Sequence, residues 1–209
     1  MVSVVLGKRT ADHTDLLVED FHQRTEGRLM NLMTSDENPA YAEAILKHYG
    51  AEVQPRRRGQ RGRRPAPQKK PPKGLHYATV HKTREKNRVV AVEQRVIYGT
   101  LTAVMMALAG SPVSDQVNTV YVERHNGTDR HRNARKARKT NRFSKDWDVH
   151  EAASYFTLYS YNFCWPVRTL RQRDPEGHWQ PRTPAMAAGL TDHIWSLSEW
   201  LGYPGVQRK

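Results

Sequence analysis

The spacing of hydrophobic and polar residues changes repeatedly along the chain, and each change predicts a strand or a helix. Short apolar or alternating runs predict strands at residues 1–6, 29–34, 76–79 and 88–98, the last two separated by a polar turn at 82–87. Apolar residues at helical spacing predict helices at residues 12–24, 39–49, 101–110, 144–164, 183–186 and 191–201. This mixture of strands and helices indicates an α/β fold.

Several of these predicted helices have features that define their ends or their surroundings. Asn38 followed by Pro39 is a typical N-cap and first helical residue, and Gly50 is a natural stop. Ser144 is expected to cap the long helix that follows it, whose aromatic residues have the helical spacing of core positions rather than of a base-stacking surface. The run at 101–110 is apolar all round, which predicts a buried helix.

Asp36 stands where the predicted strand at 29–34 gives way to the helix that starts at Pro39. In α/β folds, functional groups gather at the carboxyl ends of strands. Asp36 is therefore a candidate functional acid, and the alternative is an aspartate that only forms the turn.

The composition changes abruptly at Pro55–Gly74, which contains nine Lys and Arg residues and no acid. With so few apolar residues, this segment is expected to be mobile and disordered until it meets an opposite charge. We interpret it as a basic insert that clamps nucleic acid without regard to base sequence, in preference to a merely solvated loop.

A second basic stretch follows a single acid. Glu123 closes the short run Val120–Val122, and residues 130–145 contain eight Lys and Arg residues and no Asp or Glu. Because a carboxylate repels phosphate unless a cation lies between them, the pattern suggests a metal-binding acid beside a nucleic-acid backbone. The alternative is an exposed helix, in which Glu123 lies in the first turn and interacts favourably with the positive end of the helix macrodipole. A helix from Thr119 onward that continued through the basic stretch would carry positive charge on all sides, although Gly127 costs it about 1 kcal/mol.

Charge and composition limit the classes of molecule that this chain is expected to bind. The chain has 34 Lys and Arg against 21 Asp and Glu, which favours an anionic macromolecule. No apolar run approaches the roughly 18 residues that span a bilayer, so nucleic acid is favoured over membrane. Cys164 is the single cysteine, which excludes an internal disulfide and a cysteine-based zinc cluster and fits a reducing, cytoplasmic setting. The segment Met1–Arg9 lacks the pattern of a signal peptide.

Several short motifs closely resemble the carboxyl half of bacterial insertion-sequence DDE transposases. They are V-E-R-H-N (122–126), R-K-T (138–140), F-S-K (143–145), Y-N-F-C (161–164) and T-P-A-M-A-A-G-L-T-D-H-I-W-S-L-S-E (183–199), in this order. The stretch T-S-D-E-N-P-A-Y (34–41) is similar to the family's strand with the second catalytic aspartate, and G-K-R-T-A-D (7–12) to the segment after its early hairpin. The resemblance extends over residues 1–209, with 165–209 as a C-terminal helical extension.

The resemblance implies an RNase H-like mixed sheet flanked by helices, which performs metal-dependent DNA cleavage and strand transfer in the bacterial cytoplasm at the nucleoid. Asp36 and Glu123 would be the second and third acids of the catalytic triad. They would bind two Mg²⁺ or Mn²⁺ ions about 4 Å apart, which activate the attacking hydroxyl and stabilise the leaving oxygen. Double-stranded DNA would be the partner of a homodimer. The residues expected to hold the DNA are Arg56, Arg57, Arg58, Arg61, Arg63, Arg64, Lys82, Arg124, Asn126, Arg130, Arg132, Arg135, Lys136, Arg138, Lys139, Arg142 and Lys145.

The chain departs from the family in two places. Gly127 and Asp129 stand where the family has leucines. In addition, the family's first catalytic aspartate lies on a strand before the segment that matches Met1–Arg9, and Asp12 and Asp15 are no substitutes because that region matches a noncatalytic part. We therefore expect an N-terminally incomplete domain: a decayed copy, a downstream frame normally fused to an upstream product, or a start set too late.

Two classes of function remain open at this point. The first is a DDE transposase, and the second is a noncatalytic, truncated transposase that occupies element ends and regulates transposition. A structural RNA-binding protein fits the charge but not the paired acids or the aromatic helix.

Overall fold

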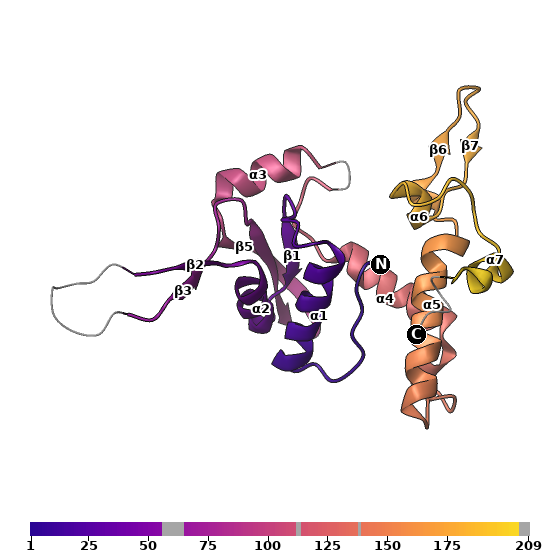
Figure 1. Ribbon diagram of the computed structural model, residues 1–209, viewed down its shortest axis with the longest axis horizontal. Helices are drawn as coiled ribbons and strands as arrows, with labels where there is room; N and C mark the ends of the chain where they lie inside the picture. Colours follow the sequence, from indigo (N-terminus) through magenta and orange to yellow (C-terminus); the bar gives the residue numbers. More distant parts are fainter. Residues whose placement is uncertain (56–64, 112–113, 138, 205–209) are drawn as a thin grey trace. The chain divides into compact units, whose positions relative to one another are not determined.

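The computed structural model describes residues 1–55, 65–111, 114–137 and 139–204, and the chain divides into two compact units (Figure 1). The N-terminal unit spans Val2–Glu123, and the C-terminal unit spans Arg124–Lys209 together with Met1. No helix in the described ranges has both the length and the hydropathy needed to cross a membrane.

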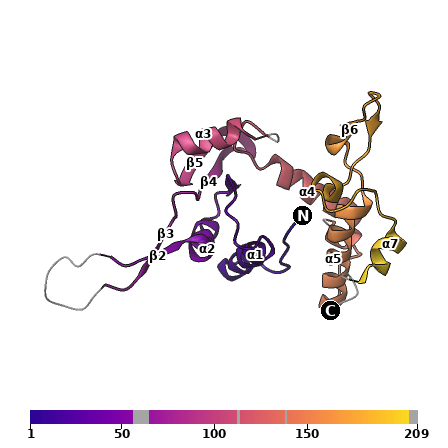
Figure 2. The ribbon, with the colours of Figure 1, turned by 45° about the horizontal axis from the view of Figure 1, so that its top comes forward.

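A mixed three-stranded sheet forms the centre of the N-terminal unit. Its strand order is β1 (Met33–Asp36), β4 (Tyr77–Glu85), β5 (Arg88–Tyr98). Strand β1 pairs with β4 in parallel, and β4 pairs with β5 in antiparallel orientation. The helices α1 (Ala11–Arg24) and α2 (Pro39–Tyr49) lie together against the sheet, and α3 (Leu101–Ala109) follows β5 (Figures 1 and 2). The predicted α/β class, with a mixed sheet and flanking helices, is confirmed.

Each face of the sheet has its own apolar core, because successive side chains of a strand point to opposite faces. Tyr77 belongs to the core under α1 and α2, and its neighbour Ala78 to the core under α3. The first core consists of Val18, Ala44, Ile45, Tyr49, Leu75 and Tyr77. The second consists of Ala78, Val80, Val104 and Val117.

The predicted ends of α2 are confirmed. The Asn38 side chain accepts a hydrogen bond from the Ala40 amide, and Pro39 is the first helical residue. Gly50 ends the helix, and a Cβ there would lie 2.2 Å from the carbonyl oxygen of Leu46, so only glycine fits. The strand before α2 was predicted at residues 29–34, and it both begins and ends later, at Met33 and Asp36. Asp36 is therefore the last residue of the strand and not part of the loop.

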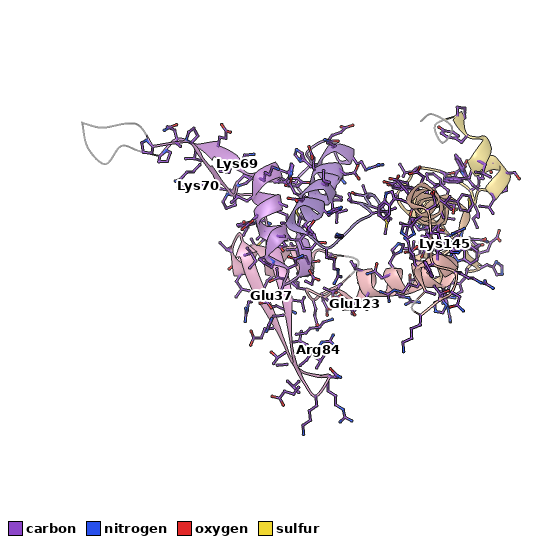
Figure 3. The ribbon with its side chains drawn as sticks, turned by 90° about the horizontal axis from the view of Figure 1, so that it is seen from below. Glu37, Lys69, Lys70, Arg84, Glu123 and Lys145 are labelled. Carbon is purple, nitrogen blue, oxygen red and sulfur yellow. The ribbon has the colours of Figure 1, made fainter. Side chains whose placement is uncertain are left out.

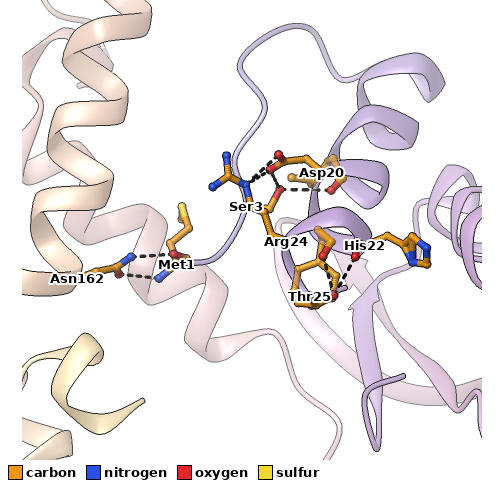
Figure 4. A network of polar contacts seen from close by, with 9 residues as sticks. Met1, Ser3, Asp20, His22, Arg24, Thr25 and Asn162 are labelled. Atoms are coloured by element: carbon orange, nitrogen blue, oxygen red, sulfur yellow. Dashed lines mark hydrogen bonds and ion pairs between the residues drawn. The ribbon is translucent and has the colours of Figure 1, made fainter. Parts of the chain in front are cut away.

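The predicted strand at Met1–Leu6 is wrong, since these residues pair with no strand in the described part of the chain. Ser3 instead donates a hydrogen bond to Asp20 Oδ2 at 2.5 Å, and Arg24 donates to the same carboxylate at 2.9 Å (Figure 4). The segment is therefore held against α1 by polar contacts, which an apolar pattern does not predict.

The basic insert is partly ordered, which corrects the prediction for its C-terminal end. Gln68–Lys70 forms β3 and pairs in antiparallel orientation with β2 (Ala51–Val53), directly after α2. The two strands form a narrow ribbon that extends from the helices (Figures 1 and 2). Residues 56–64 lie outside the described residues.

Helix α3 forms as predicted, but only Val104 is buried. Leu101, Met105 and Met106 are 65%, 61% and 71% exposed. The predicted all-round burial is therefore wrong, because α3 covers the sheet with one side only.

In the C-terminal unit, α5 (Trp147–Cys164) is the longest helix described, and the short helices α6 (Pro184–Ala187) and α7 (Leu197–Gly202) pack against it. The loop between α5 and α6 contains η2 (Arg168–Leu170) and a hairpin of β6 (Gln172–Arg173) and β7 (Trp179–Gln180). The N-cap of α5 is Asp146 rather than the predicted Ser144, whose hydroxyl bonds to His150. The aromatic residues of α5 pack as predicted only in part, since Phe156 contacts Trp200 but stays 41% exposed.

Helix α4 (Val120–Arg132) begins in the N-terminal unit and ends before most of the basic stretch. Gly127 does not interrupt it. A 3₁₀ turn, η1 (Ala134–Lys136), follows and is capped by Asn133, and Lys139 has a φ of 52°. A helix from about Thr119 onward is therefore confirmed as far as Arg132, and it does not continue through the basic stretch.

The first core predicts a large difference between two leucines. Leu75 is 0% exposed, and Leu16, on the outer side of α1, is 48% exposed. Leu75→Ala should lower the free energy of unfolding of the N-terminal unit by about 2–5 kcal/mol, because it leaves a cavity. Leu16→Ala, the matched control, should change it by less than about 0.5 kcal/mol. Urea titrations followed by circular dichroism measure both, and equal losses would contradict this core.

Candidate nucleic-acid and metal site

Asp36 ends β1 with an exposed side chain, and its carboxylate has no hydrogen-bond or ionic partner within the described residues. It precedes Glu37, which is already engaged: Glu37 accepts a hydrogen bond from Arg95 at 2.7 Å and contacts the His81 ring. Asp36 is thus the acid of this pair that is available to a cation.

Glu123 lies in the first turn of α4 (Figure 3), and its carboxylate is held by a lysine from β4. Lys82 Nζ donates to Glu123 Oε1 at 2.7 Å and to Thr119 Oγ1 at 3.1 Å. Thr119 also donates to Glu123 Oε1, at 3.0 Å. The hydrogen bond from Lys82, followed by that from Thr119, holds the pKa of Glu123 below its ordinary value.

The strand register places Asp36 and Lys82 on the same face of the sheet. Asp36 is opposite Val80 in the parallel ladder, and Lys82 follows Val80 by two positions along β4. Since side chains alternate along a strand, Asp36, Val80 and Lys82 share one face. The register therefore places Asp36 on the sheet face from which Lys82 reaches Glu123, and no contact in the described residues joins Asp36 to Lys82 or to Glu123.

An open groove of about 620 Å³ lies near the start of β1 and of α4. Its lining includes Thr34 and Tyr121 but neither Asp36 nor Glu123. Leu29, Leu32 and Leu108 supply apolar walls. Since Tyr121 and Glu123 are two positions apart on a helix, their side chains point to different sides of α4, and the groove is separate from the contact between Glu123 and Lys82.

The basic residues predicted to bind nucleic acid fall into three groups. Those exposed without an ion pair in the described ranges are Arg124, Arg130, Arg135, Lys139, Arg142 and Lys145, and Asn126 is also exposed. Those that lie outside the described residues are Arg56, Arg57, Arg58, Arg61, Arg63, Arg64 and Arg138.

The third group is engaged inside the protein. Lys82 binds Glu123, and Arg132 stacks over the Trp165 ring at 3.5 Å and the Tyr161 ring at 5.0 Å. Lys136 binds Asp129 at 2.9 Å, and both of these side chains are largely buried. Arg132 and Lys136 therefore hold the C-terminal unit together, a role that the count of positive charges along the sequence does not indicate.

Two groups of carboxylate and imidazole side chains could hold a metal ion, and the sequence analysis predicted neither. One consists of Asp15, Glu19 and His48, and the other of Asp174, Glu176 and His178. Within the described ranges, neither Asp36 nor Glu123 is a member of such a three-residue group. The spacing of Asp15 and Glu19, four positions apart in a predicted helix, is a signal that could have found the first group.

No protein-family model matches the chain, and comparison with curated proteins and with solved structures finds no match either.

The contact between Lys82 and Glu123 predicts a measurable shift in acidity. The pKa of Glu123 should lie below the ordinary value of about 4.3, and Lys82→Met should raise it, because the neighbouring ammonium favours the charged carboxylate. The ion pair contributes stability above that ordinary value and loses it as the pH falls through the lowered pKa. Carboxyl ¹³C NMR titration measures the pKa. Lys70→Met, on β3, is the matched control and should leave it unchanged; a normal pKa in the unmodified protein would contradict the contact.

Proposed function

We propose that the protein binds double-stranded DNA and performs divalent-metal-dependent phosphoryl transfer of the DDE transposase type, on an RNase H-like sheet. The observation that supports this most is the shared sheet face of Asp36 and the Lys82–Glu123 pair. Carboxylates are the ligands that Mg²⁺ and Mn²⁺ prefer, and two such ions drive an in-line displacement at phosphorus without a protein nucleophile.

In this proposal, Asp36 and Glu123 hold the metal, and the metal supplies charge neutralisation and activation of the attacking hydroxyl. Lys82 then has two roles. It neutralises Glu123 in the free protein, as the 2.7 Å contact supports, and it turns to a substrate phosphate when a cation takes its place. Lys82 thereby keeps Glu123 ionised and ready to bind a cation.

The exposed basic residues from Arg130 onward are proposed to hold DNA phosphates. Arg130, Arg135 and Arg142 carry charge into solvent without an ionic partner in the described part of the chain. Repulsion among such unpaired positive charges is relieved by a polyanion, and counterion release adds affinity for it. A homodimer is proposed because two DNA ends must be joined.

The second candidate is a DNA-binding protein without catalysis, which occupies element ends and regulates transposition. A specific observation favours it: Glu123 already has a cation partner, and the described residues offer no third His, Cys, Asp or Glu grouped with Asp36 and Glu123. A pair of metal ions needs more carboxylate ligands than these two residues supply.

Acid substitutions distinguish the two candidates. Asp36→Asn and Glu123→Gln should each lower Mn²⁺-dependent strand transfer of duplex DNA ends by at least about 100-fold, because the metal supplies several kcal/mol of transition-state stabilisation. DNA affinity should stay unchanged or rise slightly, since a negative charge is removed. Glu52→Gln, an exposed acid on β2, is the control.

The outcome of this assay decides between the candidates in one step. Activity in the unmodified chain that is lost in both variants supports the enzyme. No strand transfer by the unmodified chain, together with intact DNA binding, favours the noncatalytic candidate. Undiminished activity in either variant would contradict the catalytic role of that acid.

Adjacent basic residues should respond differently to loss of charge. Arg135→Gln should reduce the slope of log affinity against log salt by about 0.9, the value for one phosphate contact on duplex DNA, with a stability change within about 0.5 kcal/mol. Lys136→Gln should instead destabilise the C-terminal unit by about 3 kcal/mol, because it leaves Asp129 charged and shielded from water. Fluorescence anisotropy over a salt series and thermal unfolding measure the two effects. A loss of stability in Arg135→Gln, or none in Lys136→Gln, would contradict this assignment.

A further inference from the structure

A cluster of metal-binding side chains lies on the N-terminal unit between α1 and α2, apart from the acids of the proposed catalytic site. Asp15 and Glu19 come from α1, four positions apart and thus on one face, and His48 comes from the last turn of α2. Their ligand atoms all lie within 4.8 Å of one another. All three side chains are half-buried, and the side chain of His48 is only 13% exposed.

A protein cation already occupies this cluster. Lys47 Nζ lies 2.5 Å from Asp15 Oδ2, and His48 Nε2 lies 2.9 Å from Asp15 Oδ1. The cluster is therefore a place where the fold stabilises positive charge, and Lys47, whose side chain is 60% exposed, can leave it for solvent.

A further imidazole lies near this cluster, and it also packs edge-on against Tyr49. The Nδ1 atom of His22 is shielded from solvent and has no hydrogen-bond partner in the described part of the chain. His22 follows Asp15 by seven positions, so it lies on the same face of α1, and its ring centroid is 6.3 Å from that of His48. Buried imidazole nitrogens normally have a partner, and water carried by a bound cation is one that would satisfy it.

The other group of this kind does not have these properties. Asp174 accepts hydrogen bonds from the amides of Glu176 and His178 and from the Gln180 side chain, so its oxygens are used to close the β6–β7 turn. The His178 side chain is 75% exposed. The second group is therefore explained as turn structure and serves as a control.

We propose that Asp15, Glu19 and His48 bind a Zn²⁺-class divalent cation, which replaces the Lys47 ammonium and clamps α1 to α2. One imidazole nitrogen with two carboxylates is a donor set for zinc, whose ligand distances are about 2.0–2.2 Å. Mg²⁺ prefers oxygen ligands in a regular octahedron and keeps its waters, so the imidazole discriminates against it. Small side-chain rotations bring ligand atoms from within 4.8 Å to the closer spacing of a zinc site.

The test uses the full chain with Cys164→Ser, so that the thiol does not contribute, and a chromophoric chelator that competes for Zn²⁺. One tight equivalent is expected with ZnCl₂ and none with MgCl₂, together with a rise in Tm that EDTA reverses. Glu19→Gln and His48→Gln should each weaken zinc binding more than about tenfold. Glu19→Gln is the most informative variant because it leaves both contacts of Asp15 in place.

Lys47→Met should strengthen zinc binding, whereas the substitutions of the ligands weaken it. It removes the competing ammonium, so zinc should bind at least about threefold more tightly while the metal-free protein loses its contact with Asp15. Asp20→Asn, a neighbour on α1 that binds Arg24, and His178→Gln are matched controls that should leave zinc binding unchanged. Zinc binding that is absent, unaffected by Glu19→Gln and His48→Gln, or abolished by His178→Gln would overturn the proposal.

Discussion

The parallel pairing of β1 with β4 is the constraint on which the N-terminal unit depends. Its register sets Met33 opposite Tyr77 and Asp36 opposite Val80. The Ser35 and Tyr77 hydroxyls meet at 2.6 Å across the ladder, on the face that α1 and α2 cover. The alternate residues Ala78 and Val80 face α3. A slip of one residue would move Asp36 to the opposite face, away from Lys82, because side chains alternate with a period of two.

The parts of this fold that the sequence predicts are those that local chemistry determines. The helix α2 has its N-cap, its proline and its terminal glycine within the segment itself, and its limits were predicted closely. The strand β5 has the predicted limits, but β4 runs from Tyr77 to Glu85, so the predicted polar turn at 82–87 is wrong except at Lys86 and Asn87. The sequence left open whether the helix from Thr119 continues through the basic stretch, and the structure ends α4 at Arg132, where Asn133 caps the following 3₁₀ turn.

The errors arise where a contact distant in sequence decides the structure. Met1–Leu6 has the apolar pattern of a strand, yet Ser3 is fixed to Asp20 of α1 instead of to a neighbouring strand. Ser144 and Asp146 are both good N-caps, and Asp146 is the one whose side chain accepts a hydrogen bond from the amide of Val149, while the Ser144 hydroxyl bonds to the His150 ring. The ribbon of β2 and β3 pairs residues before the basic insert with residues inside it, which no local pattern in a polybasic segment can predict.

In the candidate site too, some features follow from the local sequence and others from contacts between distant residues. Asp36 and Glu123 were selected by their places in the sequence and then by resemblance, but the sheet face of Asp36 follows from the strand register, and the setting of Glu123 from Lys82, which the sequence marked only as a basic residue. Counting charges likewise did not separate Arg132, which stacks on Trp165, from the exposed Arg130. Burial and pairing decide which positive charges remain available to a polyanion.

Lysine occupies the cation position in both acidic clusters of the N-terminal unit, Lys82 at Glu123 and Lys47 at Asp15. In a strongly basic chain, an internal ammonium keeps each carboxylate ionised without a metal. A divalent ion can therefore displace the lysine only if it also gains coordination bonds that the ammonium does not make.

At Asp15 the imidazole of His48 supplies a nitrogen ligand that an ammonium cannot use, which favours a zinc-class ion. At Glu123 the described neighbours supply oxygen ligands only, so a hard cation there needs the oxygens of a bound phosphate to compete with Lys82. Metal and DNA would then bind together at one cluster, and metal alone at the other.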